Sequence, residues 1–125
     1  MKEIGIESSL VEAIRNGEKT IEGRLGKPRF LKMNVGDILS IREDVWIDGK
    51  NIGSQDYKLL VKITQILYFE TFKEMLESID FTAAVPSAKS VRDAVNKYSE
   101  FYSVDDEEKY GVVAIFFELI DDIHA

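Results

Sequence analysis

Residues 58–68, Lys-Leu-Leu-Val-Lys-Ile-Thr-Gln-Ile-Leu-Tyr, carry the clearest structural signal in the sequence. This stretch is long and rich in β-branched side chains, which predicts a β-strand. Apolar side chains fall on both of its faces, so neither face is expected to lie wholly in water. Such a pattern is typical of a barrel strand that has further elements packed against its outer side.

Downstream of this strand the sequence predicts two helices. Thr71–Glu74 has the form of a capping box, and the apolar residues after it recur at helical spacing: Phe72, Met75, Leu76 and Ile79. After the connector Phe81–Lys89, Ser90 is expected to cap a helix whose inward residues are Val91, Ala94, Val95, Tyr98 and Phe101. The acidic run Asp105–Glu108 predicts a solvated turn, and Tyr110–Ile120 predicts a final strand.

Upstream of the long strand the predicted elements are shorter. Ser9–Glu12 is another capping-box pattern and is expected to begin a helix that stops at Asn16 and Gly17. Lys19–Leu25 alternates as a strand, in which Gly23 indicates a bulge or a close approach. The other elements are a helical turn at Pro28–Leu31, a turn at Val35–Asp37, a strand at Ile38–Arg42 and a hairpin tip or loop at Trp46–Gly53.

The order of these elements predicts an α+β fold. Strands and helices are grouped along the chain and do not alternate as βαβ units. The final strand is expected to return and pair with an early or a central strand. We therefore expect residues 1–125 to form a single domain, a half-closed β-barrel of about five to six strands with short helices covering it.

Composition excludes several classes of protein. The chain of 125 residues has no cysteine, so disulfide frameworks and thiolate zinc sites are excluded and a cytoplasmic location is expected. The longest apolar run, Val112–Phe117, is too short to span a bilayer, and no membrane partner is expected. The one histidine, His124, lies in the tail, and Asp105–Glu108 lacks calcium-loop spacing. We therefore predict no metal and no cofactor.

The charge distribution indicates a focused anion site. The net charge of −7 argues against a broad, non-specific nucleic-acid surface. Between Arg15 and Lys32, however, six basic residues face two acidic ones, a local charge of +4 within a chain that otherwise carries −11. Basic residues on a solvated loop would give the same count.

Three residues of this segment have complementary chemistry. Arg24 offers a planar fork for a phosphate or a base edge, and Lys19 adds a mobile charge beside it. Glu22 can accept a hydrogen bond from an exocyclic amine or hold Arg24 by an ion pair. The simpler alternative is an exposed Glu22–Arg24 salt bridge, which would stabilise the fold by about 0–1 kcal/mol.

Further residues extend the predicted site. Lys27, Arg29 and Lys32 are candidate phosphate contacts, although lysines in such a loop often serve solubility alone. Trp46, Tyr57 and Tyr68 are the aromatic residues considered for stacking on a base, because the other rings lie on predicted core stripes or in the last strand.

The segment Gly-Glu-Lys-Thr-Ile-Glu-Gly-Arg at residues 17–24 resembles the signature of the ASCH domain family. This family is related in fold to the PUA RNA-binding domain. Residues 68–76 and 110–115 and the helix that reaches Tyr98 and Tyr102 are also similar to its longer members. The resemblance therefore covers nearly the whole chain.

This resemblance implies a PUA-like barrel that binds RNA or a modified nucleoside or nucleotide in a cleft. The cleft residues implied are Lys19, Glu22 and Arg24, and Thr20 lies among them. One branch of the family is an amidohydrolase that removes the acetyl group from acetylcytidine with a Lys, a Thr three positions later and a distant Glu. Lys19 matches that Lys, and Glu22 stands where the Thr would be.

Three functions are therefore carried forward. The first is a module that binds RNA or a nucleoside. The second is an amidohydrolase in which Lys19 activates water or attacks the substrate directly, while Glu22 or a downstream glutamate, Glu70 or Glu74, moves protons. The third is a protein-interaction domain without a ligand. The natural ligand and the oligomeric state are not predicted.

Overall fold

Five strands form one mixed sheet that coils into a half-barrel in the computed structural model, which describes residues 2–53 and 57–123. The strand order is β1-β3-β6-β7-β2. The strands are β1 (Lys2–Glu7), β2 (Ile21–Leu25), β3 (Ile38–Asp44), β6 (Tyr57–Phe69) and β7 (Val112–Asp122). β1 pairs with β3 in parallel, and all other neighbours are antiparallel. The half-closed barrel predicted from the sequence is confirmed.

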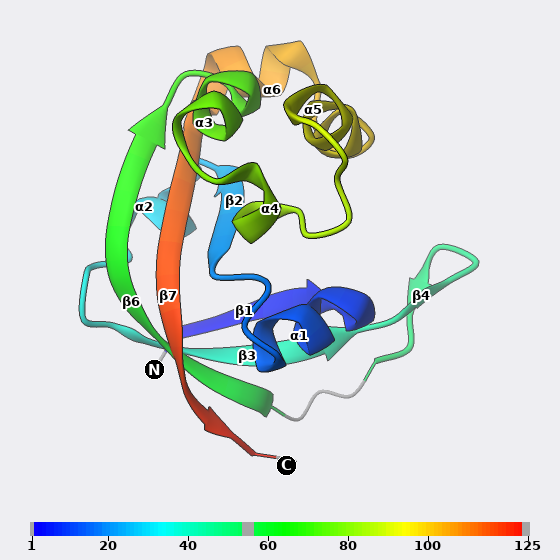
Figure 1. Ribbon diagram of the computed structural model, residues 1–125, viewed down its shortest axis with the longest axis vertical. Coiled ribbons are helices and arrows are strands. Elements are labelled where there is room, and N and C mark those ends of the chain that lie inside the picture. Colours follow the sequence, from blue (N-terminus) through cyan, green and yellow to red (C-terminus); the bar gives the residue numbers. More distant parts are fainter. Residues whose placement is uncertain (1, 54–56, 124–125) are drawn as a thin grey trace.

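The long strands β6 and β7 run side by side along the molecule, while β1 and β3 lie across it (Figure 1). β7 alternates between two cores. Val113, Ile115 and Phe117 point into the core inside the half-barrel, whereas Val112 and Ala114 belong to the core under the helices. β6 does the same, with Leu59, Val61 and Ile63 in the inner core and Leu67 and Phe69 packed against the core under the helices. The prediction that residues 58–68 form a barrel strand packed on both faces is therefore confirmed.

Helices close the two ends of this sheet. α1 (Ser8–Arg15) packs its buried residues Val11 and Ile14 into the inner core. α3 (Phe72–Ser78), α4 (Phe81–Ala84), α5 (Val91–Ser99) and α6 (Val104–Tyr110) gather at the opposite end (Figure 1). α2 (Pro28–Leu31) is the single predicted helical turn. No helix in the described part of the chain is long and apolar enough to cross a membrane.

A small hairpin projects from the end of β3. Its strands are β4 (Trp46–Ile47) and β5 (Lys50–Asn51), and they form a separate two-stranded sheet. Asp48 and Gly49 at its tip both have positive φ, 50° and 76°, as a two-residue hairpin turn of this kind requires. The predicted hairpin at Trp46–Gly53 is confirmed.

Several predicted details were wrong. β1 was not expected, and it precedes α1, whose N-cap is Glu7 and not a serine of the predicted Ser9–Glu12 capping box. Residues 105–108 lie in helix α6 and not in a turn. At Thr71 only half of the predicted capping box forms. The Thr71 hydroxyl accepts from the backbone N–H of Glu74, but the Glu74 carboxylate accepts from the backbone N–H of Glu70 instead of that of Thr71. His124 lies outside the described residues.

The capping box of α6 explains why residues 105–108 are helical. The Ser103 hydroxyl accepts from the backbone N–H of Asp106, and the Asp106 carboxylate accepts from the backbone N–H of Ser103. Acidic side chains in the first turn of a helix also interact favourably with its dipole. A charge run that suggested a solvated loop therefore begins a helix.

Replacing Ser103 with Ala should lower the free energy of unfolding by about 1 kcal/mol, because the backbone N–H of Asp106 in the first turn of α6 loses its cap. Urea unfolding measures this change. Ser78→Ala is the matched control, since Ser78 is an exposed serine at the end of α3 that caps no N-terminus. We expect the control to stay within about 0.5 kcal/mol of the native chain. Equal effects of the two substitutions would contradict this account of α6.

Candidate binding cleft

A cleft opens between the two edge strands of the half-barrel, β1 and β2. Its volume is about 590 Å³, within the range of small-molecule sites. Residues 5–7 of β1 and 22–24 of β2 line opposite sides. The other lining residues are Ser9, Leu10, Lys19, Asp44, Trp46, Ala84, Val85, Ser87, Lys97, Tyr98, Glu100, Phe101 and Tyr102. Because β1 and β2 do not pair with each other, this opening is where the barrel remains unclosed.

Lys19 is buried at the floor of this cleft, with 1% of its surface exposed. Gly17, at φ 85°, turns the chain after α1, and the backbone N–H of Lys19 then donates to the carbonyl of Ala13. Its Nζ donates to the carbonyl oxygens of Ile21 (2.7 Å) and Ala84 (2.6 Å) and lies 3.1 Å from Glu22 Oε1. Three acceptors thus meet the three hydrogens of an ammonium group, and Lys19 is fixed where a mobile charge was predicted.

Glu22 joins Lys19 to Arg24. Its Oε1 pairs with Lys19, and its Oε2 accepts from Arg24 Nε at 3.0 Å and lies 2.9 Å from Arg24 Nη2. Burial alone would raise the pKa of Glu22, but the charges of Lys19 and Arg24 outweigh it and hold that pKa below its ordinary range. Glu22 is therefore ionised at neutral pH. The predicted Glu22–Arg24 pair exists, but it is a buried network and not an exposed surface bridge.

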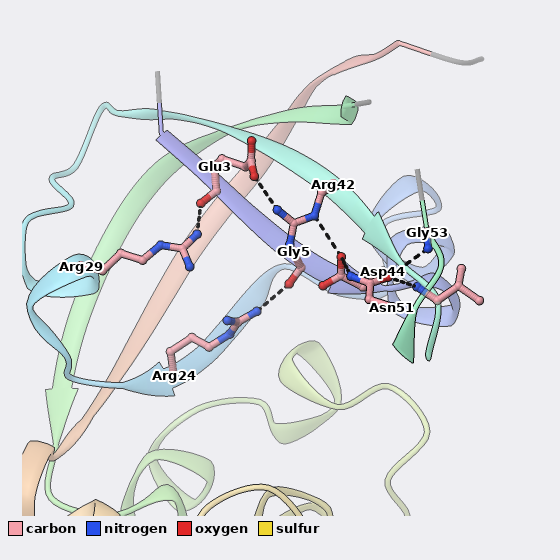
Figure 2. Close-up of polar contacts among 9 residues, drawn as sticks. Glu3, Gly5, Arg24, Arg29, Arg42, Asp44, Asn51 and Gly53 are labelled. Carbon is pink, nitrogen blue, oxygen red and sulfur yellow. Dashed lines mark hydrogen bonds and ion pairs between the residues drawn. The ribbon is translucent and has the colours of Figure 1, made fainter. Parts of the chain in front are cut away.

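Arg24 crosses the opening of the barrel. Its Nη2 donates to the carbonyl oxygen of Gly5 on β1 at 2.8 Å, as Figure 2 shows. Arg29, from α2, also donates to β1, at the carbonyl oxygen of Glu3. The guanidinium of Arg24 lies 5.4 Å from the centre of the Phe30 ring. Arg24 thus bridges the two strand edges where a closed barrel would have backbone hydrogen bonds, and Arg29 ties α2 to β1 beside it.

A second polar network holds the hairpin beside the cleft. Arg42 pairs with Glu3 and donates from Nε to Asp44 Oδ1 at 3.0 Å. Asn51 donates to the same Asp44 oxygen at 2.8 Å, and its Oδ1 accepts from the backbone N–H groups of Val45 and Gly53 (Figure 2). The base of the hairpin that carries Trp46 is therefore fixed to β3.

Two tyrosines, Tyr98 and Tyr102, form an aromatic wall of the cleft. Each stacks on the buried Phe72 ring, with 4.3 Å between ring centroids for Tyr98 and 5.2 Å for Tyr102. Burial raises the pKa of both tyrosines, so both are neutral phenols. Gly23 lies against this wall, because a Cβ there would come within 2.8 Å of the Tyr98 hydroxyl oxygen. Of the two predictions for Gly23, the close approach is confirmed, since β2 pairs with β7 without a register shift.

The structure brings Lys19, Glu22 and Arg24 together, as predicted. Trp46 also lines the cleft. The remaining predicted contacts do not line it: Thr20, Lys27, Arg29, Lys32, Tyr57 and Tyr68. Lys27 instead lies over the Tyr110 ring, and the backbone of Thr20 pairs with Ala83 and Phe117. Neither Glu70 nor Glu74, the two downstream glutamates considered for catalysis, lines the cleft.

Sequence reasoning missed several cleft residues. Phe101 was predicted to face the core, yet 77% of its surface is exposed and it lines the cleft. The helical spacing that favoured burial ends at Ser99, where α5 stops. Gly5 and Ile6 were missed with the strand that carries them. Asp44 lies two residues beyond the end of the predicted strand Ile38–Arg42, and only its charge marked it in the sequence.

The ionised Glu22 makes the free energy of unfolding depend on pH, and Glu22→Gln removes this dependence. At neutral pH the variant leaves Lys19 buried without its counter-charge, and we expect its free energy of unfolding to fall by about 3 kcal/mol. Because the pKa of Glu22 lies below its ordinary value of 4.5 in the folded chain, this contribution is complete above about pH 4.5 and is lost as the pH falls through the folded-state pKa. Urea unfolding of both chains from about pH 7 to about pH 3 measures it.

Glu77→Gln, at an exposed position of α3, is the control for this experiment. We expect it to stay within about 0.5 kcal/mol of the native chain at every pH. A difference between the native chain and Glu22→Gln that does not shrink in acid would contradict an ionised, buried Glu22.

Comparison with known proteins found solved structures with a similar fold. Solved structures include the hypothetical protein PH0355, which is 37% identical, with 96% of this chain and 100% of that chain covered and a TM-score of 0.79. Protein PF0455 from Pyrococcus furiosus is 32% identical, with 96% and 97% covered and a TM-score of 0.72. A mutant form of ZmASCH from Zymomonas mobilis is 18% identical, with 98% and 76% covered and a TM-score of 0.58, which shows a shared fold.

No curated protein matches the chain. The sequence model of the ASCH domain matches residues 4–121, which include β2, residues 4–7 of β1 and every residue that lines the cleft. The chain therefore belongs to the ASCH domain family.

Proposed function

We propose that this chain binds RNA or a nucleoside in the cleft between β1 and β2. The observation that carries the proposal is the state of Arg24. Its side chain is held by Glu22 and by the carbonyl of Gly5, yet 21% of it is exposed, and among the described residues no acceptor pairs with Nη1. A fixed guanidinium with one unused NH₂ group is suited to a base edge or a phosphate oxygen.

Lys19 supports this function indirectly. Its three acceptors leave it no hydrogen for a ligand, so its part is to neutralise Glu22 and hold the carboxylate toward Arg24. The floor of the cleft, counted over these three groups, then carries one net positive charge. Membership of a family related in fold to an RNA-binding domain supports the same proposal.

Lys27 and Arg29 stay predicted contacts for a longer strand of RNA that leaves the cleft. Both are exposed and neither lines the cleft. The amidohydrolase and the protein-interaction domain stay predictions from the sequence, because no contact among the described residues of the cleft favours either of them.

Replacing Arg24 with Gln tests the proposal. A charge-assisted hydrogen bond contributes about 1.5–3 kcal/mol, so we expect binding of single-stranded RNA or of nucleosides to weaken at least about tenfold. Isothermal titration calorimetry with a mixed-sequence oligoribonucleotide and with the four ribonucleosides and acetylcytidine measures the affinity. Arg24→Lys keeps the charge without the fork, and we expect it to recover only part of the loss.

Arg92→Gln is the matched control, because Arg92 is an exposed arginine of α5 that does not line the cleft. Thermal unfolding of each variant shows whether the fold is intact. Unchanged binding by a folded Arg24→Gln variant would remove Arg24 from the site and contradict the proposal.

A further inference from the structure

Phe101 is exposed to a degree that packing does not explain. Its exposed fraction, 77%, is higher than that of every other large hydrophobic side chain among the described residues. Trp46, at 61%, is the next most exposed aromatic residue, and both line the same cleft although they come from separate elements. Exposed apolar side chains that gather at one concave site indicate an interaction surface.

Both rings are presented by rigid backbone. Phe101 lies between Tyr98 and Tyr102, which stack on Phe72, and its backbone N–H donates to the carbonyl of Tyr98 at 3.0 Å. Trp46 begins the hairpin whose base Asn51 fixes to Asp44 at 2.8 Å. In Figure 1 the hairpin and α5 lie on the same side of the molecule. Because the backbone at both positions is held in this way, little backbone entropy is lost when a ligand stacks on the two rings.

The charges that line the cleft disfavour a phosphate inside it. Four carboxylate side chains line it, from Glu7, Glu22, Asp44 and Glu100, against three cationic ones, from Lys19, Arg24 and Lys97. The positive charge of Lys19 is already matched by Glu22. A phosphate group would bring up to two further negative charges into a lining that is negative in sum, whereas an uncharged ring would bring none.

We propose that the cleft takes the base of its ligand and leaves phosphate groups outside, with the base stacked on Phe101 and Trp46 and one of its acceptor atoms hydrogen-bonded by Arg24. This inference rests on the proposed function and specifies which part of the ligand enters the cleft. An uncharged nucleoside, or a single unstacked base of an RNA strand, is the class of ligand that meets these conditions.

Calorimetric titrations with adenosine, guanosine, cytidine and uridine, each compared with its 5′-monophosphate, test the proposal. We expect the nucleoside that binds best to bind at least about threefold more tightly than its monophosphate. Stacking on an aromatic side chain is sensitive to truncation, so Phe101→Ala should weaken that binding at least about fivefold and Phe101→Tyr should restore it. Quenching of Trp46, the only tryptophan of the chain, gives an independent readout.

Tyr68→Ala is the matched control. Tyr68 is 59% exposed, similar to Trp46, but it lies on β6 and does not line the cleft. We expect the control to bind as the native chain does.

The outcomes separate the two proposals. If the best nucleoside binds, and Arg24→Gln weakens it, but Phe101→Ala does not, the stacking inference is wrong and the proposed function stands. Tighter binding of the monophosphate than of the nucleoside likewise overturns the inference alone. If neither the nucleosides, the monophosphates nor the oligoribonucleotide binds the native chain, both proposals are wrong.

Discussion

Glu22 holds two cations at once, and this buried arrangement ties together β2, β1 and the end of α4. One of its oxygens pairs with the buried Lys19 and the other with Arg24. A buried carboxylate is stable only when charges and hydrogen bonds compensate for lost hydration, and here both cations lower its pKa despite burial. Lys19 also binds the end of α4, so the network connects β2 to the helical end of the molecule.

Arg24, a member of this network, also satisfies part of the unpaired edge of the half-barrel. β1 and β2 are edge strands, and an unpaired edge exposes backbone groups that need partners. Arg24 and Arg29 supply hydrogen bonds to the carbonyls of Gly5 and Glu3 and still leave an opening between the strands. That opening is the cleft. A continuous ladder of hydrogen bonds between β1 and β2 would close the barrel and remove the cleft. The proposed site therefore exists because these two strands do not pair.

The sequence predicted those elements whose structure follows from their local amino-acid composition. Residues 58–68 have the β-branched composition of a strand, and the charges at Lys19, Glu22 and Arg24 indicated a site. β1 was missed because its six residues are a strand mainly through pairing with β3. Phe101 was misplaced because helical spacing assumes a helix that has already ended at Ser99. Lys27 and Arg29 were grouped with the site by charge, but neither lines the cleft, because they lie at the start of α2.

A two-dimensional NMR titration of the isotope-labelled chain with the nucleoside that binds best would locate the ligand on the molecule. If the ligand enters the cleft, the largest shift changes will fall on the backbone of Gly5 and Gly23, the Nε–H of Arg24 and the indole N–H of Trp46, which surround it. Changes confined to other faces, such as the exposed Lys27 and Arg29, would contradict binding in the cleft.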